Sequence, residues 1–128
     1  MKKDNKGFSL VELIIVIAIM AVLVGLLAPQ YLKYVENSKV STDISNAQEV
    51  ATAINVAFAD DNPSFKAGMT PTVLPDGKSL PALKATGAGA NMVVTIDDNG
   101  VKSITDGTNE LWPDPKKAGT GYYTVHHK

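Results

Sequence analysis

The sequence of 128 residues contains no cysteine and no arginine. Without cysteine the chain can form no disulfide, no thiolate metal site and no cysteine nucleophile, so we expect packing alone to hold its folded part together. Twelve lysines stand against thirteen acidic residues, and the net charge is -1. This balance does not favour binding to a phosphate backbone, and we expect no nucleic acid as a partner.

Motifs of catalysis and cofactor binding are also missing from the sequence. It has no G-x-S-x-G nucleophile motif, no G-x-G-x-x-G fingerprint and no Walker loop. Residues 87–89 (GAG) have glycines like those of a phosphate loop without its spacing, so a flexible loop is the better interpretation. We therefore predict a protein that is not an enzyme and that has no catalytic, cofactor-binding or metal-binding residues.

Apolar residues are concentrated near the N-terminus. Residues 1–7 are polar and carry three lysines, and the run from Phe8 to Ala28 that follows has Glu12 as its single charged residue. The run has 21 residues, and a helix rising about 1.5 Å per residue would cross the ~30 Å hydrocarbon core of a bilayer. The lysines should stay in the cytoplasm, which places everything after residue 30 on the outer side. The sequence thus predicts a single-pass membrane protein.

Glu12 does not suit a simple membrane anchor. A carboxylate in a membrane segment costs roughly 2.5 to 3.5 kcal/mol at the helix centre and somewhat less near an end. An acid in such a place is a candidate functional residue that needs a partner. A cleavable secretory signal would need a small-x-small site, which residues 25–29 (GLLAP) match poorly. A generic anchor is the competing interpretation, but it leaves Glu12 without a role.

The N-terminal residues resemble a known signal. The run GFSLVE at residues 7–12, followed by LIIVIAIMAVLVGLLAPQY, is similar to the class III signal of type IV prepilins and pseudopilins. The resemblance covers roughly residues 6–60. It implies that a prepilin peptidase cuts after Gly7, removes residues 1–7 as a leader and methylates the new N-terminal residue, Phe8. It also implies that Phe8 and Glu12 take part in assembly.

The resemblance also implies a function. The chain would be the structural subunit of a type IV pilus-like filament, a homo-oligomer that serves adhesion, motility or DNA uptake. Its partners would be the prepilin peptidase, the membrane, and the assembly platform with its ATPase. The subunit would start in the membrane and end in an extracellular filament on the bacterial surface. Two alternatives stay open, namely a pseudopilin of a type II secretion or competence system and a signal-anchored binding domain.

A single long helix is predicted from about residue 8 to 59. Gly25 and Pro29 match positions where the resemblance implies a loosened helix, and an interior proline removes a backbone hydrogen bond. Residues 8–30 form the transmembrane and polymerisation part, and residues 31–60 an amphipathic part of the outer head, 31–128. Apolar residues spaced by 4, 3, 4, 3 and 4 predict its buried stripe. They are Val40, Ile44, Ala47, Ala51, Ile54 and Phe58.

The rest of the head is predicted to be a loop followed by a small sheet. Residues 61–90 contain four prolines and four glycines, which is typical of a long loop, with at most a helical turn at 80–85. Residues 91–96 and 101–104 flank Asp97-Asp98-Asn99-Gly100, a strong hairpin pattern, and residues 122–126 (YYTVH) suggest a third strand. The predicted fold class is α+β, with the long helix packed on an antiparallel sheet in residues 91–128.

Three features of the head have two interpretations each. Asp97, Asp98 and Asn99 could bind calcium, but a tight turn needs the same residue types and is favoured. His126 and His127 would point to opposite faces of a strand, so we expect surface histidines and no shared metal. Trp112 is expected to pack in the core or at the sheet edge rather than to form a surface contact site.

Overall fold

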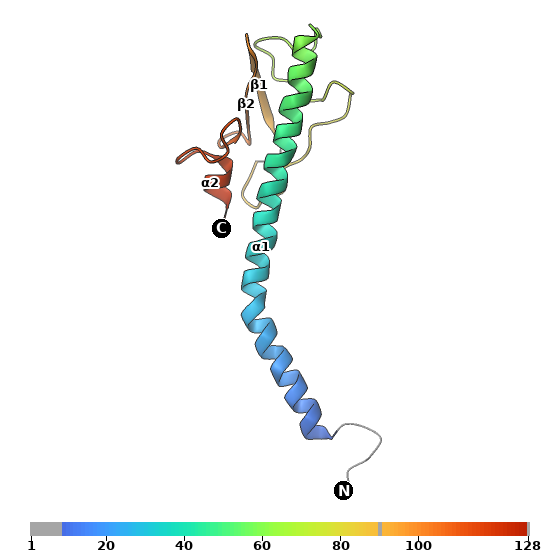
Figure 1. The fold of residues 1–128 in the computed structure, drawn as a ribbon, viewed down its shortest axis with the longest axis vertical. Helices are drawn as coiled ribbons and strands as arrows, with labels where there is room; N and C mark the ends of the chain where they lie inside the picture. Colours follow the sequence, from blue (N-terminus) through green and yellow to red (C-terminus); the bar gives the residue numbers. More distant parts are fainter. Residues whose placement is uncertain (1–8, 90, 128) are drawn as a thin grey trace. The chain divides into compact units, whose positions relative to one another are not determined.

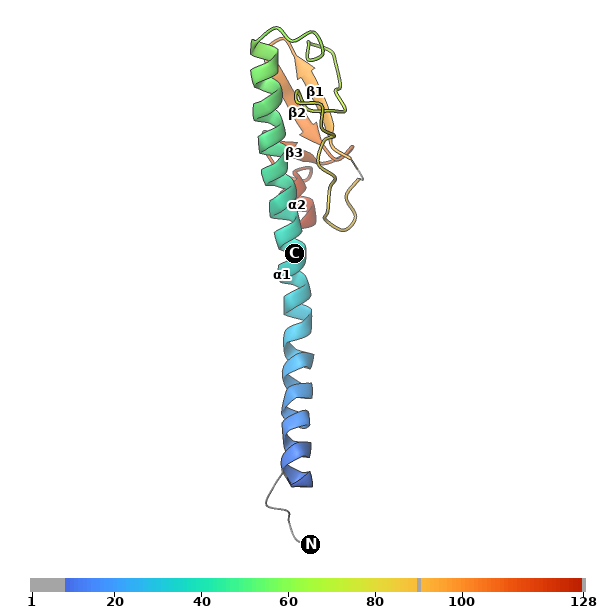
Figure 2. The same ribbon diagram turned by 90° about the vertical axis from the view of Figure 1, so that its right-hand side faces the viewer.

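The computed structural model describes residues 9–89 and 91–127. The element order is a long helix α1 (Leu10–Ala59), three strands and a short helix α2 (Tyr122–His126). The chain divides into two compact units, Met1–Val35 and Glu36–Lys128. The second unit is the head, in which the C-terminal part of α1 runs alongside the sheet (Figures 1 and 2). The predicted α+β class is confirmed.

Helix α1 ends where the sequence predicts. The N–H of Asn62 donates to the carbonyl of Ala57 at 3.0 Å, and the N–H of Asp61 donates to the carbonyl of Phe58 at 3.1 Å. Asp61 has a φ of 58°, the left-handed conformation that commonly terminates a helix, and Pro63 follows shortly after. These bonds satisfy carbonyls that the last helical turn leaves without partners.

The sheet has the order β1-β2-β3, and both pairings are antiparallel. Its strands are β1 (Val93–Asp97), β2 (Gly100–Thr105) and β3 (Glu110–Trp112). The predicted hairpin is confirmed, because β1 and β2 pair from Val93 with Thr105 to Asp97 with Gly100. The outer edge of β1 is partly covered, since the N–H of Gly68 donates to the carbonyl of Ile96 at 2.8 Å.

The prediction of a strand at residues 122–126 is wrong, because these residues form helix α2. The Val125 N–H donates to the Gly121 carbonyl at 2.9 Å, as in a helical turn. Tyrosine, threonine and valine favour strands, but that preference depends on packing, and here Tyr122 and His126 are both buried on one face of the helix. The third strand is β3 instead, which escaped prediction because it has three residues.

Residues 61–90 form the predicted irregular connection where the structure describes them. The helical turn allowed for at residues 80–85 is not formed, and Ala82 pairs with Asn91 in an isolated bridge. The backbone there has other partners, because the N–H groups of Lys84 and Ala85 donate to the carboxylate of Asp43 on α1. This bonding removes the donors that a helical turn would use.

The core of the head lies between α1 and the sheet. The predicted stripe is confirmed, with Val40, Ala47, Ala51 and Ile54 buried and with Ile44 and Phe58 partly buried against them. Buried residues from the rest of the head complete the core. They are Phe65, Ala85, Met92, Val94, Ile96, Val101, Ile104, Leu111 and Tyr122. Burial of each large apolar side chain stabilises the head by about 1.5 to 3 kcal/mol.

Candidate functional site

The start of helix α1 is built by two side chains that bond reciprocally. The backbone N–H of Ser9 donates to Oε1 of Glu12 at 2.9 Å, and the backbone N–H of Glu12 donates to Oγ of Ser9 at 3.2 Å. This is a capping box, which satisfies two of the N–H groups that every helix start leaves without partners. Gly7 and Phe8, the predicted processing residues, lie outside the described residues.

The apolar segment of α1 presents its large side chains to its surroundings. Residues from Leu10 to Leu27 are exposed in the isolated chain, and this helix is long and apolar enough to cross a membrane. Helix α1 continues through Gly25 and Pro29, and a Cβ atom added to Gly25 would meet no side chain within 4 Å. Pro29 has no N–H to donate to the carbonyl of Gly25, four residues earlier, and this missing bond is the reason to expect a kink. The kink at these two positions stays a prediction.

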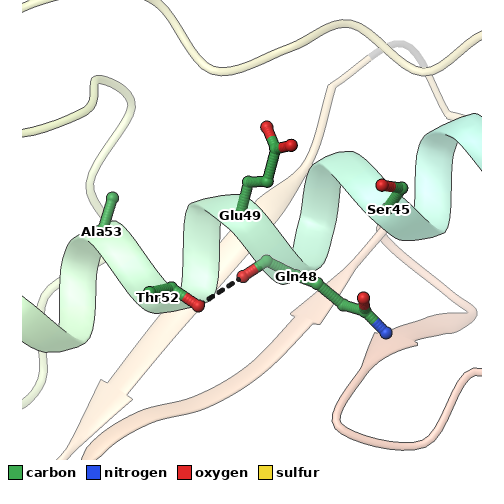
Figure 3. A pocket seen from close by; sticks show the side chains of 5 residues that line it. All are labelled: Ser45, Gln48, Glu49, Thr52 and Ala53. Carbon is green, nitrogen blue, oxygen red and sulfur yellow. Dashed lines mark hydrogen bonds between the residues drawn. The ribbon is translucent and has the colours of Figure 1, made fainter.

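A shallow hollow lies along the outward face of α1 in the head (Figure 3). Its lining consists of Ser45, Gln48, Glu49, Thr52 and Ala53. These residues follow one another along two turns of a single helix, and the hydroxyl of Thr52 already donates to the carbonyl of Gln48 at 3.0 Å. A pocket that binds a small molecule is concave and brings polar groups together from several directions. This hollow is therefore a helix surface.

The residues that suggested a calcium site form a turn. The N–H of Asn99 donates to Oδ1 of Asp97 at 2.8 Å, and Gly100 has a φ of 116° that side-chain-bearing residues rarely adopt. Elsewhere in the described ranges, 9–89 and 91–127, no three His, Cys, Asp or Glu residues lie close enough to hold a metal ion. The geometry at Asp97–Gly100 supports the interpretation as a turn.

The buried carboxylate of Asp43 is the centre of the polar contacts in the head. Asp43 is fully buried, and its two oxygens each accept from the Lys84 N–H at 2.9 Å. Its Oδ2 also accepts from the Ala85 N–H at 3.0 Å and from the Tyr122 hydroxyl at 2.5 Å. Burial and then the bond to Asp43 raise the pKa of Tyr122, so its hydroxyl stays protonated and donates.

The two histidines differ, and the prediction that both lie at the surface is wrong for His126. His127 is exposed and stacks on Tyr123, with ring centroids 4.3 Å apart. His126 is 8% exposed, and its Nε2 lies 3.4 Å from Oδ2 of Asp106. Burial alone would raise the pKa of Asp106, but hydrogen bonds from the N–H groups of Asn109 and Thr108, with smaller help from His126, lower it.

Trp112 packs as the sequence predicts. It lies on β3, at the edge of the sheet, and it is partly buried against the core. Pro113, which cannot donate to a neighbouring strand, directly follows the end of β3.

Known proteins share both the N-terminal segment and the head. The profile of the prokaryotic N-terminal methylation motif matches residues 2–28. Type IV major fimbrial protein FimA of Dichelobacter nodosus is 33% identical over 118 residues, with 85% of this chain and 76% of FimA covered. The chain belongs to the type IV pilin family. Fimbrial protein EcpC of Eikenella corrodens is 35% identical over 101 residues, with 74% of this chain and 63% of EcpC covered.

A further relative of this pilin is prepilin peptidase-dependent protein A of Clostridium perfringens, which is 26% identical over 124 residues, with 94% of this chain and 78% of the relative covered. No solved structure matches the chain. A type IV pilin is a structural subunit from which filaments are assembled. The fimbrial relatives favour this function over a pseudopilin or an anchored binding domain. The exposed apolar helix of the pilin fits both a membrane-anchored precursor and a surface filament.

Sequence reasoning missed three features of this pilin that the structure reveals. The pattern Ser-x-x-Glu before an apolar run, at Ser9 and Glu12, is a recognisable signal of a capping box. Asp43 stands between Val40 and Ala47 at helical spacing, a pattern that could have indicated a buried acid. The partner of that acid, Tyr122, gave no comparable signal, because it is distant in the chain.

Proposed function

We propose that this pilin is matured by a prepilin peptidase that cuts between Gly7 and Phe8 and methylates Phe8. The match of the methylation motif to residues 2–28 is the observation that carries this proposal. Glycine suits the position before the cut, because the absence of a side chain lets the peptidase approach the backbone closely. Lys2, Lys3 and Lys6 keep the leader in the cytoplasm, and the head then lies outside.

Glu12 receives its partner when the chain is cut. Cleavage gives Phe8 a free α-amino group, which is largely cationic at neutral pH. An incoming subunit displaced along the filament axis can present this amine to Glu12 of a subunit that is already assembled. A buried charge left without its partner costs about 3 to 5 kcal/mol, which is enough to select the correct axial register. The pairing of Glu12 with the amine therefore sets the register of the filament.

The assembled filament is a helical homo-oligomer that an assembly platform and its ATPase extend from the membrane. Its proposed tasks are adhesion, motility or DNA uptake. Support comes from the names of the relatives, which are fimbrial proteins, and from the exposed apolar segment of α1. That segment costs free energy in water, so it is favourable only in lipid or against other apolar helices.

Processing is tested by the change Gly7→Val in a strain in which this chain is the sole major subunit. Wild-type filaments, sheared from the surface and analysed by mass spectrometry, should begin at Phe8 with one added methyl group. The Gly7→Val chain should keep its leader and stay in the membrane fraction. Ala67→Val, a matched change at an exposed loop position of the head, should be processed like the wild type. Filaments built from chains that begin at Met1 would refute the proposal.

A further inference from the structure

Helix α2 is held in place by two carboxylates that belong to different elements. The Tyr122 hydroxyl donates to Asp43 of α1, and Nε2 of His126 lies 3.4 Å from Oδ2 of Asp106, which directly follows β2. Tyr122 and His126 are one helical turn apart and share the buried face of α2, with ring centroids 4.6 Å apart. Both ends of this short helix are thus held.

On its own, α2 would be weak. It has five residues, and its N-cap residue, Gly121, provides no side-chain hydrogen bond. Isolated helices shorter than about 12 to 15 residues are marginal in water, so docking against the head must supply the stability of α2. The docked position depends on the buried Tyr122 ring and on the two contacts with carboxylates, together with the N–H of Tyr123, which donates to the Pro115 carbonyl at 2.7 Å.

The segment 84–89 is fastened to the same groups. Its amides reach α1, because the N–H groups of Lys84 and Ala85 donate to Asp43, and the N–H of Thr86 donates to Glu36 at 2.6 Å. The C-terminal end of this segment, at Gly87 and Gly89, packs close to His126 of α2 and to Asp106, which follows β2. A Cβ atom added to Gly87 would lie 3.8 Å from Cε1 of His126, and one added to Gly89 would collide with the Asp106 carbonyl.

A single oxygen atom joins the two segments. Oδ2 of Asp43 accepts from both the Tyr122 hydroxyl and the Ala85 N–H. If Tyr122 leaves, a fully buried carboxylate loses a donor, and the free energy of that carboxylate rises unless water reaches it. Water can reach it when α2 or segment 84–89, which supply its donors, moves away. The hairpin of β1 and β2 is held instead by its own backbone ladder.

We propose that α2 and segment 84–89 form a strap that opens and closes as one cooperative unit, with Asp43 as the common anchor. Opening of the strap uncovers Asp43 and Asp106 and changes the surface of the head, while the β1–β2 hairpin and the α1 stripe stay folded. The strap gives the pilin a conformational change inside the head that does not require global unfolding.

Hydrogen exchange of the full-length protein in detergent micelles, followed by mass spectrometry, tests the strap. Tyr122→Phe keeps the ring and removes the hydroxyl that Asp43 binds. We expect exchange about tenfold or more faster both in residues 84–86 and in residues 122–127, because a hydrogen bond to a charged group is lost. Residues 93–105, which contain the hairpin, should exchange at the wild-type rate. Tyr123→Phe, a matched change at the partly buried neighbour, should alter neither segment.

A second variant tests the contact between the strap and Asp106. His126→Gln weakens the contact with Asp106 without touching Asp43, and it should also accelerate exchange in residues 84–86. Two outcomes overturn the proposal. In one, Tyr122→Phe accelerates exchange in α2 while residues 84–86 keep the wild-type rate. In the other, hydrogen exchange becomes as much faster in the hairpin as in the strap, which would mean that the head opens as a whole.

Discussion

The hydroxyl of Tyr122 donates a hydrogen bond to the carboxylate of Asp43, although the two residues stand 79 positions apart in the chain. The bond joins the C-terminal helix α2 to the long helix α1, which carries the apolar segment. Both partners are fully buried, so neither can exchange the other for water while the head stays closed. In a chain without cysteine, this pair and the backbone donors around it connect the end of the head to its start.

Replacement of Asp43 by alanine should destabilise the head by about 3 kcal/mol or more, because the Lys84 and Ala85 N–H groups and the Tyr122 hydroxyl lose their buried acceptor. Urea unfolding of the full chain in detergent measures the loss, and the fluorescence of Trp112, the single tryptophan, reports on the head. Glu49→Ala, an exposed acid on the same helix, is the control and should change stability by less than about 0.5 kcal/mol. Equal effects of the two changes would contradict the role of Asp43.

The fold follows from the sequence wherever a short-range pattern carries the information. The stripe from Val40 to Phe58 and the turn at Asp97–Gly100 are patterns of this kind, and both are confirmed. Helix α2 is different, because its residues favour a strand locally and become helical through Tyr122 and His126, whose partners lie far away in the chain. Tertiary contacts of this kind are not readable from neighbouring residues.

Gly100→Ala should cost more stability than Gly77→Ala, and the difference measures a close contact. Both glycines have positive φ angles, 116° and 89°, so alanine is strained at either position by about 1 to 2 kcal/mol. A Cβ at Gly100 would also collide with Oδ1 of Asn55, which accepts the Val101 N–H at 2.8 Å, whereas open space surrounds Gly77. We expect an additional loss of about 1 kcal/mol for Gly100→Ala in urea unfolding. Equal losses would show that Asn55 moves aside freely.

Acid should destabilise the head through Asp106. The pKa of Asp106 is lowered in the folded state, so the unfolded chain binds its proton at a higher pH than the folded chain does. The stabilisation is complete above the unfolded pKa of about 3.9 and is lost as the pH falls through the lower folded pKa. Urea unfolding from pH 2 to pH 6 should therefore show a smaller dependence on pH for Asp106→Asn than for the wild type. Asp98→Asn, at an exposed acid, should follow the wild-type curve, and an unchanged slope for Asp106→Asn would refute this prediction.

The candidate site at the N-terminus shows what sequence can and cannot supply. The proposed roles of Gly7, Phe8 and Glu12 follow from the resemblance of a short motif, because the proposed processing would depend on local sequence. The Ser-x-x-Glu pattern also indicates the capping bond of Glu12, but no local pattern indicates a partner on a neighbouring chain. In the single chain its Oε1 is bound to the Ser9 N–H, whereas the proposed partner in the filament belongs to a neighbouring copy. A carboxylate has several acceptor positions, so Glu12 can keep this bond while it accepts the proposed partner.

Glu12→Gln separates the charge of this residue from its role in the helix start. Glutamine can fill the same position of a capping box, so the bond to the Ser9 N–H and the start of α1 should be preserved. The charge that would pair with the amine of Phe8 is lost. We expect normal processing and membrane insertion, with filament yield reduced at least tenfold, because the correct register is no longer favoured by an ion pair. Quantitative immunoblots of sheared and membrane fractions measure both quantities in one strain.

The companion change Ser9→Ala removes the other half of the capping box and keeps the charge of Glu12. It should cost α1 about 1 kcal/mol at its first turn and leave assembly largely intact. A competing interpretation places the Glu12 carboxylate at the lipid headgroups without a protein partner, as long side chains near a membrane surface can do. In that case Glu12→Gln would give near-normal filaments, since a neutral side chain is easier to place there than a charged one. Wild-type filament yield from Glu12→Gln as the sole subunit would thus exclude the pairing with Phe8. Loss of filaments in Glu12→Gln, with normal filaments in Ser9→Ala, would assign the effect to the charge of Glu12.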